Sequence, residues 1–132
     1  MSSVRVGTDL IEVATVADSL RQFGQAYLDR VFMPDEIAYC TAGGDEMARR
    51  LAARFAAKEA CIKVLRPPDG GIDWRWIEVR KMPGGWCDLL LHAGARQLAG
   101  TQGLSQWSVS LSHEGPYAIA VVAASVEPPG RP

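Results

Sequence analysis

The sequence lacks an excess of charge of either sign. Lys and Arg together number 14 and Asp and Glu number 15, which leaves a formal net charge of -1 over 132 residues. Binding of nucleic acid or of an anionic membrane across a whole surface needs many uncompensated cations. We therefore expect neither kind of partner, and any basic site must be local.

Long apolar runs and a cysteine framework are also missing. No stretch reaches the roughly 20 apolar residues of a membrane-spanning helix, and the first residues lack the apolar core of a secretory signal. Cys40, Cys61 and Cys87 are odd in number and form no CxxC motif, which argues against a disulfide scaffold or a zinc knuckle. We expect a cytoplasmic protein with small, reduced, buried thiols.

The residues that are present fit one folded domain. Hydrophobic residues make up 48% and charged residues 22% of the chain, a balance typical of a globular domain of this length. Glu127 is followed by three prolines, a glycine and an arginine. We predict a single domain over residues 1–126 and a disordered tail over residues 127–132.

Hydrophobic periodicity indicates mixed α and β structure. A period of two predicts strands, and a period near 3.6 predicts helices. The order of the segments favours an α+β domain with a largely antiparallel sheet packed on one long helix. The strands are expected over residues 4–9, 74–81, 86–91, 106–112 and 117–126, and the helices over residues 10–22, 45–65 and 92–100, with another helix starting at Met33-Pro34.

The long helix predicted over residues 45–65 carries the most unusual side chains. Lys58 falls inside its apolar stripe, where the ammonium group must reach solvent, pair with an acid or bind a ligand. Glu59 and Lys63 are four residues apart, so an ordinary i,i+4 helix pair is enough to explain them. By itself, the spacing does not distinguish these structural roles from a site.

Small and basic residues flank that pair. Ala48, Ala52 and Ala56 form a strip on the same face, and such a strip lets another backbone or a ligand approach closely. Arg50 and Arg54 lie on the other flank. They could face an anion, although a solvated basic face is the more ordinary explanation of such a pattern.

Asp9 stands where the first predicted strand meets the first predicted helix. It suits a helix N-cap, or its carboxylate could meet Glu59 across the fold. Two carboxylates, completed by water and phosphate oxygens, are a usual way to hold Mg²⁺. Gly7 would allow close approach of another backbone at this strand, or mark an irregularity in it.

His113 follows a strand of alternating apolar and serine residues. Neighbouring residues of a strand point to opposite faces, so Ser112 and His113 do not suit a nucleophilic pair. A contact to phosphate or another ligand is the functional interpretation of His113, and a turn histidine without a task is the alternative.

Three motifs occur in order along the chain: GTDLIEV at residues 7–13, RFAAKEA at residues 54–60 followed by Lys63, and VSLSH at residues 109–113 followed by YAIA at residues 117–120. This set resembles the holo-acyl-carrier-protein synthase family, the small single-domain 4′-phosphopantetheinyl transferases. The resemblance spans nearly the whole chain and implies the fold of that family.

The resemblance also implies an activity and its site. The phosphopantetheine arm of coenzyme A moves to a serine of an acyl carrier protein, as in fatty acid or polyketide biosynthesis, and adenosine 3′,5′-bisphosphate leaves. Residues matching Asp9 and Glu59 bind Mg²⁺ at the pyrophosphate, and family members are usually homotrimers with the site between protomers. Asp9, Glu59 and Lys63 form the implied catalytic set, and Arg54, Lys58, Lys63 and His113 the implied coenzyme A contacts.

Elementary electrostatics agrees with that chemistry. Attack of a serine on the β-phosphorus places negative charge on the leaving nucleotide, and a divalent ion with a lysine beside it neutralises this charge. The serine proton needs an acceptor, which could be Glu59 or a metal-bound water.

The sequence departs from the family pattern at three places. Thr15 stands where an arginine usually helps to dock the acidic carrier, Gly84-Gly85-Trp86 replaces a Gly-Lys-Pro hairpin, and Arg66-Pro67-Pro68-Asp69 replaces a Gly-rich turn. A specialised polyketide or peptide carrier is therefore a second option for the substrate. The alternative functions are a non-catalytic carrier-binding module and a Mg²⁺-dependent nucleotide hydrolase.

Overall fold

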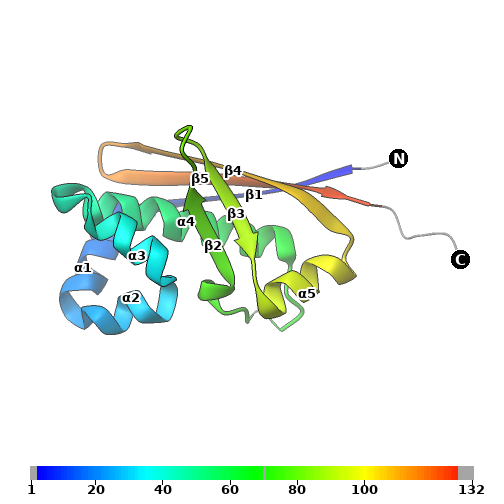
Figure 1. The fold of residues 1–132 in the computed structure, drawn as a ribbon, viewed down its shortest axis with the longest axis horizontal. Helices are drawn as coiled ribbons and strands as arrows, with labels where there is room; N and C mark the ends of the chain where they lie inside the picture. Colours follow the sequence, from blue (N-terminus) through cyan, green and yellow to red (C-terminus); the bar gives the residue numbers. More distant parts are fainter. Residues whose placement is uncertain (1–2, 70, 128–132) are drawn as a thin grey trace, which may run out of the picture.

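The structure, a computed structural model, describes residues 3–69 and 71–127 (Figure 1). The predicted tail over residues 127–132 therefore lies outside the described residues, except for Glu127. The elements, in order, are β1 (Ser3–Glu12), α1 (Val13–Phe23), α2 (Gln25–Val31), α3 (Pro34–Thr41), η1 (Gly44–Glu46), α4 (Met47–Leu65), η2 (Trp74–Trp76), β2 (Ile77–Lys81), β3 (Cys87–Leu91), α5 (Ala93–Thr101), β4 (Leu104–Glu114) and β5 (Tyr117–Val126).

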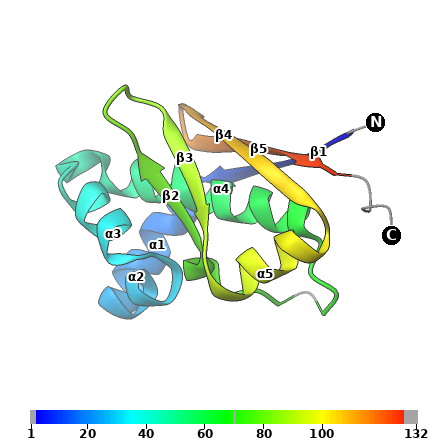
Figure 2. The same cartoon turned by 45° about the vertical axis from the view of Figure 1, so that its right-hand side comes forward.

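The described strands form two antiparallel sheets. One has the order β1-β5-β4 and the other is the β2-β3 hairpin. The β1-β5 ladder runs from Ser3 opposite Val126 to Glu12 opposite Tyr117. The long helix α4 lies along one face of the larger sheet, and the hairpin crosses α4 (Figures 1 and 2). The prediction of an α+β domain with antiparallel sheets on one long helix is confirmed.

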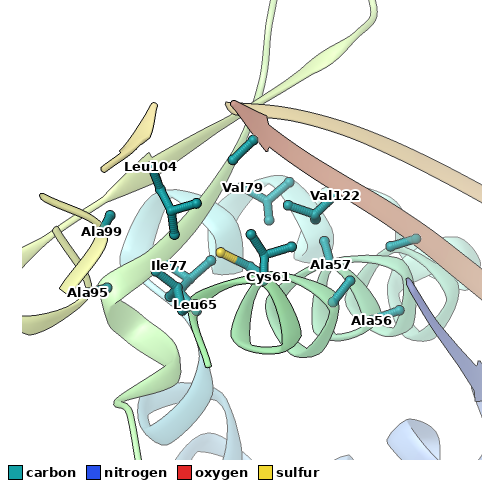
Figure 3. Close-up of a cluster of buried hydrophobic side chains, with 14 residues drawn as sticks. Ala56, Ala57, Cys61, Leu65, Ile77, Val79, Ala95, Ala99, Leu104 and Val122 are labelled. Carbon is teal, nitrogen blue, oxygen red and sulfur yellow. The ribbon is translucent and has the colours of Figure 1, made fainter. Parts of the chain in front are cut away.

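Small residues bring α4 close to the larger sheet. Alternate residues of β5, from Ala118 to Ala124, are buried against the helix. At Gly7 of β1, an added Cβ atom would lie 2.2 Å from the carbonyl oxygen of Ala60, so only glycine fits there. The close backbone approach expected at Gly7 is therefore present. Figure 3 shows the core cluster that continues from α4 to the hairpin and α5.

A second apolar cluster holds α1, α2 and α3 against the N-terminal half of α4. Its fully buried members include Val16, Phe32 and Leu51, one from α1, one from the segment after α2 and one from α4. Figure 2 shows these three short helices grouped at one end of α4. Both clusters include residues of α4, so this helix is the common packing surface for the elements on either side of it.

Several predicted boundaries are wrong. Residues 10–12 belong to β1 rather than to the first helix, because their backbone pairs with β5. The helix α2 was not predicted, and residues 74–76 form a 3-10 turn before β2. Gly94 lies in the first turn of α5, where it packs against the Trp76 ring.

The larger sheet leaves one face exposed. On β1, Val4, Val6 and Leu10 are 66%, 60% and 61% exposed, and Ile119 and Val121 of β5 lie beside them on the same face. A contiguous exposed apolar surface of this kind more often marks an interaction site than a surface that stays in contact with water. In the described parts of the chain, no helix is long and apolar enough to cross a membrane.

Candidate active site

Asp9 lies within β1 and points toward α4. The Nζ atom of Lys63 is 3.3 Å from Asp9 Oδ1 and donates a hydrogen bond of 2.7 Å to the carbonyl oxygen of Thr8. Asp9 is not a helix N-cap, because α1 begins at Val13 and its N-cap residue is Glu12. The strand alternation that turns Gly7 and Asp9 toward α4 is what brings this carboxylate to the helix.

Glu59 completes the cluster from α4. Partial burial raises the pKa of the Glu59 carboxyl, and the negative charge of Asp9 adds to that shift. A hydrogen bond from the Trp74 side chain and, to a smaller extent, the charge of Lys63 oppose this rise in the pKa of Glu59, and Lys63 forms its ion pair with Asp9. Asp9 and Lys63 therefore both lie near enough to Glu59 for their charges to act on its carboxyl group.

The donor set fits a hard divalent cation that keeps part of its water shell. In residues 3–69 and 71–127, no group of three His, Cys, Asp or Glu side chains comes together, so a cage of protein ligands for zinc is not seen there. Two neighbouring carboxylates, one with a pKa raised by burial and further by the charge of the other, suit Mg²⁺, which typically takes one or two carboxylates plus water and phosphate oxygens.

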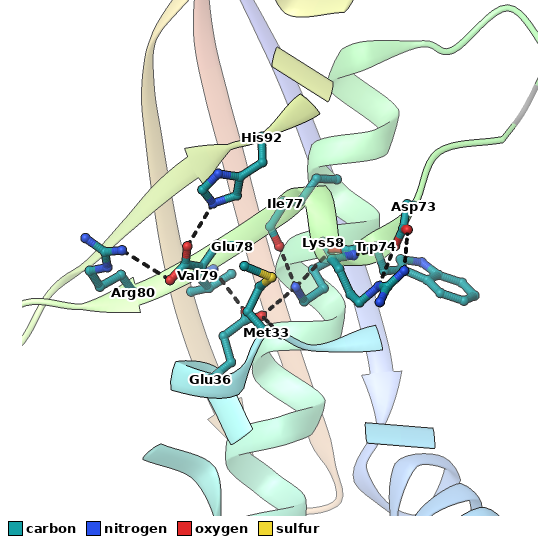
Figure 4. Close-up of polar contacts among 11 residues, drawn as sticks. Met33, Glu36, Lys58, Asp73, Trp74, Ile77, Glu78, Val79, Arg80 and His92 are labelled. Atoms are coloured by element: carbon teal, nitrogen blue, oxygen red, sulfur yellow. Dashed lines mark hydrogen bonds and ion pairs between the residues drawn. The ribbon is translucent and has the colours of Figure 1, made fainter. Parts of the chain in front are cut away.

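Lys58 does not join this cluster. Its side chain is fully buried, and its Nζ atom donates to Glu36 Oε1 at 2.8 Å, to the carbonyl oxygen of Trp74 at 3.1 Å and to that of Ile77 (Figure 4). All three N–H donors are used. The ammonium therefore neither reaches solvent nor faces a ligand, and the structure assigns it to the buried pair rather than to the implied coenzyme A contacts.

Glu36 is the buried partner that sequence reasoning missed. Besides Lys58, its carboxylate accepts hydrogen bonds from the backbone N–H groups of Met33 at 2.8 Å and Val79 at 3.0 Å. It therefore joins α3, α4 and β2. A signal was available, since Glu36 stands in the first turn of a helix that opens with Pro34, but an acid there is ordinary and its burial cannot be read from the pattern.

Arg54 and His113 line one groove. This basic groove, of about 450 Å³, lies between the N-terminal part of α4, the end of β2 and the end of β4. Arg54 is 4% exposed and its Nε atom has no hydrogen-bond partner, whereas His113 is exposed within β4. The cationic residues that line the basic groove are Arg49, Arg50, Arg54 and Lys81, with His113 at the sheet.

The altered hairpin shapes the same groove. Trp86, which is 59% exposed, lines it, and its ring packs so closely on Gly84 that a Cβ atom at that glycine would overlap it. Gly85 and Trp86 of this hairpin therefore form part of the groove wall. Asp9, Glu59 and Lys63 do not line the basic groove, so the candidate residues form two separate clusters on one chain.

A third feature is an apolar groove of about 360 Å³ beside α1 and α2. It is lined by Phe23, Tyr27, Phe55 and Trp74, among others. The Phe55 and Trp74 rings pack with centroids 5.7 Å apart, and Phe55 precedes Glu59 by about one turn of α4. The apolar groove is therefore adjacent to the carboxylate cluster.

Comparison with known proteins connects these features to one family. A family model described as the 4′-phosphopantetheinyl transferase superfamily matches residues 5–122. The chain is 43% identical over 118 residues to the holo-acyl-carrier-protein synthase of Moorella thermoacetica, covering 89% of this chain and 91% of that protein. It is 39% identical over 117 residues to the corresponding synthase of Koribacter versatilis, covering 88% of this chain and 93% of that protein.

A solved structure shows the same fold. The synthase of Chronobacterium ammoniagenes, in a complex with coenzyme A, superimposes with a TM-score of 0.82 at 28% identity, covering 96% of this chain and 99% of that chain. The match spans both candidate clusters, α4 and the larger sheet. The chain belongs to the 4′-phosphopantetheinyl transferase superfamily, among the holo-acyl-carrier-protein synthases.

Proposed function

We propose that this chain transfers the 4′-phosphopantetheine arm of coenzyme A to a serine of an acyl carrier protein, with Asp9 and Glu59 holding a Mg²⁺ ion. The observation that carries the proposal is the convergence of Asp9 from β1 with Glu59 and Lys63 from α4, in a chain whose relatives are synthases of this kind. Bound Mg²⁺ would neutralise charge on the diphosphate.

The residues of the chain support the same reaction. The serine oxygen of the carrier forms a bond to the β-phosphorus, the bond from that phosphorus to the nucleotide breaks, and adenosine 3′,5′-bisphosphate takes the electron pair. Lys63 is more than half exposed and stands beside Asp9, so it can donate to a phosphate oxygen as charge develops there. Glu59, whose pKa is raised by burial, is a protein group that can accept the serine proton.

The basic groove suits the nucleotide end of coenzyme A. Its cationic side chains are suited to binding phosphate. Within one chain, the groove is separate from Asp9 and Glu59. We propose that the two clusters complete each other across an interface, with the carboxylates of one protomer facing the basic groove of the next. The exposed apolar face formed by Val4, Val6, Leu10, Ile119 and Val121 supports such an assembly, and a homotrimer closes the contact.

The apolar groove is the proposed docking place of the carrier. It lies beside Glu59, so a protein bound there would present its serine to the carboxylate cluster. Arg30 lines this groove and gives it a cation for an acidic partner. Thr15 is exposed on α1, one turn before Ser19 of the groove wall, so the missing arginine alters the rim rather than the apolar floor.

Incubation with coenzyme A, Mg²⁺ and an apo carrier protein should add the mass of one 4′-phosphopantetheine group to the carrier, as read by mass spectrometry. Chelation of Mg²⁺ and replacement of the acceptor serine of the carrier by alanine should each abolish the gain. A chain that binds carriers in calorimetry but modifies none of several would be a non-catalytic module. Release of phosphate without a carrier would instead indicate a nucleotide hydrolase.

Light scattering on the purified chain should give three times the monomer mass. The substitution Val6→Glu places a charge within the exposed apolar face and should shift the protein to monomers, because burial of that charge in an interface is costly. Gln97→Glu, on the exposed side of α5, should leave the trimer intact. A wild-type monomer at micromolar concentration would contradict the proposed assembly.

A further inference from the structure

The ring of Tyr39 contacts three cationic side chains of the basic groove. The guanidinium carbons of Arg50 and Arg54 lie 4.3 Å and 4.4 Å from its centroid, and Lys81 Nζ lies 5.4 Å from it. The two arginines come from α4, whereas Lys81 ends β2 and Tyr39 belongs to α3. One aromatic side chain therefore gathers charge from two other elements by cation–π attraction.

Hydrogen bonds and close packing hold this arrangement before any ligand binds. Arg50 Nη1 donates to the carbonyl oxygen of Tyr39 at 2.8 Å, and Lys81 Nζ donates to the Tyr39 hydroxyl at 3.1 Å. Arg54 Nη1 donates to the carbonyl oxygen of Arg50 at 3.3 Å. Gly43 packs on Arg50 so closely that a Cβ atom there would lie 2.7 Å from its Nε atom.

The three cations are not neutralised from within the groove. Of the described residues that line the groove, Glu46 is the one with a carboxylate, and its side chain forms an ion pair with Arg49. Arg54 Nε is buried without a hydrogen-bond partner, and an orphaned buried donor is destabilising unless something accepts from it. A compact anion entering the groove would satisfy that donor and offset the mutual repulsion of the cations.

We propose that Tyr39 is a positioning residue that sets specificity for the phosphate monoester of coenzyme A. The inference rests on the proposed function, in which the pyrophosphate is bound at Asp9 and Glu59. The groove then remains for the other phosphate group, the monoester on the ribose. Tyr39 acts through Arg50, Arg54 and Lys81: its ring keeps three like charges together at the spacing that a dianion needs.

Steady-state kinetics with coenzyme A and with 3′-dephospho-coenzyme A tests this role. Tyr39→Leu should raise KM for coenzyme A by about tenfold, more than it lowers kcat, and should leave KM for the dephospho form nearly unchanged. Tyr39→Phe keeps the ring and loses only the Lys81 hydrogen bond, so its KM should rise by about threefold or less. Lys81→Met, which changes an exposed side chain, should reduce the same discrimination without a risk to folding.

Equal changes in KM for both donors, or unchanged discrimination in Tyr39→Leu and Lys81→Met, would overturn the proposal. Calorimetry with adenosine 3′,5′-bisphosphate and adenosine 5′-phosphate separates it from the proposed function, because binding needs no carrier. Tighter binding of the bisphosphate by the wild type that is lost in Tyr39→Leu supports the role even if no carrier is modified. Equal wild-type affinities for the two nucleotides contradict it.

Discussion

Replacing Glu59 by glutamine should lower turnover at saturating coenzyme A by at least about 100-fold. Glutamine keeps the size and one oxygen of the side chain but removes the charge, so both cation binding and proton acceptance at this position are weakened. Glu59 is partly buried beside Asp9, where no other described acid is placed to substitute for it. The rate of carrier modification, measured by mass spectrometry over a series of Mg²⁺ concentrations, provides the readout.

Two companion variants make the test specific. Asp9→Asn should lower turnover and weaken the Mg²⁺ dependence in the same way, and the double variant should be little worse than the poorer single one, since both remove the same bound ion. Asp45→Asn changes an exposed acid in η1 just before α4 and should have near-wild-type rates. A Glu59→Gln protein with wild-type turnover and Mg²⁺ dependence would remove Glu59 from the metal site.

The sequence was enough to predict that Asp9 could meet the helix α4, and the reason is physical. Hydrophobic alternation correctly predicted a strand around Asp9, and an i,i+4 spacing placed Glu59 and Lys63 on one face of a long helix. The N-cap alternative for Asp9 fails because β1 continues to Glu12 along β5. Periodicity could not show this, since Leu10 fits a helical stripe as well as it fits the exposed face of a strand.

Features that depend on contacts between distant segments of the chain could not be predicted from the sequence. The partner of Lys58 lies 22 residues away, and its two backbone acceptors come from the segment at Trp74–Ile77, so no local pattern indicates that the ammonium is satisfied. The meeting of α3, α4 and β2 around Tyr39 is likewise a tertiary event. The helix α2 has only 7 residues, and so short a helix derives its stability from packing rather than from propensity.

Removing one partner of the buried pair should have the largest effect on stability. Lys58→Met leaves the Glu36 carboxylate charged in the core without its cation, and breaking a buried pair in this way costs about 3–5 kcal/mol. Desolvation is the main influence on Lys58 and lowers its pKa, with Glu36 opposing it. The attraction within the pair therefore offsets burial of the ammonium only in part. Urea unfolding followed by circular dichroism gives the free energy of unfolding.

The double variant Lys58→Met with Glu36→Gln distinguishes a buried charge from a lost contact. Met33 donates to Oε1 of Glu36 and Val79 to Oε2, so the single oxygen of a neutral glutamine keeps one of these hydrogen bonds. Because the uncompensated charge costs more than one hydrogen bond, the double variant should be more stable than Lys58→Met alone. Arg21→Met breaks the exposed pair with Asp18 on α1 and should change the free energy of unfolding by less than about 1 kcal/mol. If the double variant were as unstable as the sum of the two single ones, the charge of Glu36 would not be the cause. The loss would then come from the hydrogen bonds by which Lys58 ties α4 to the start of β2.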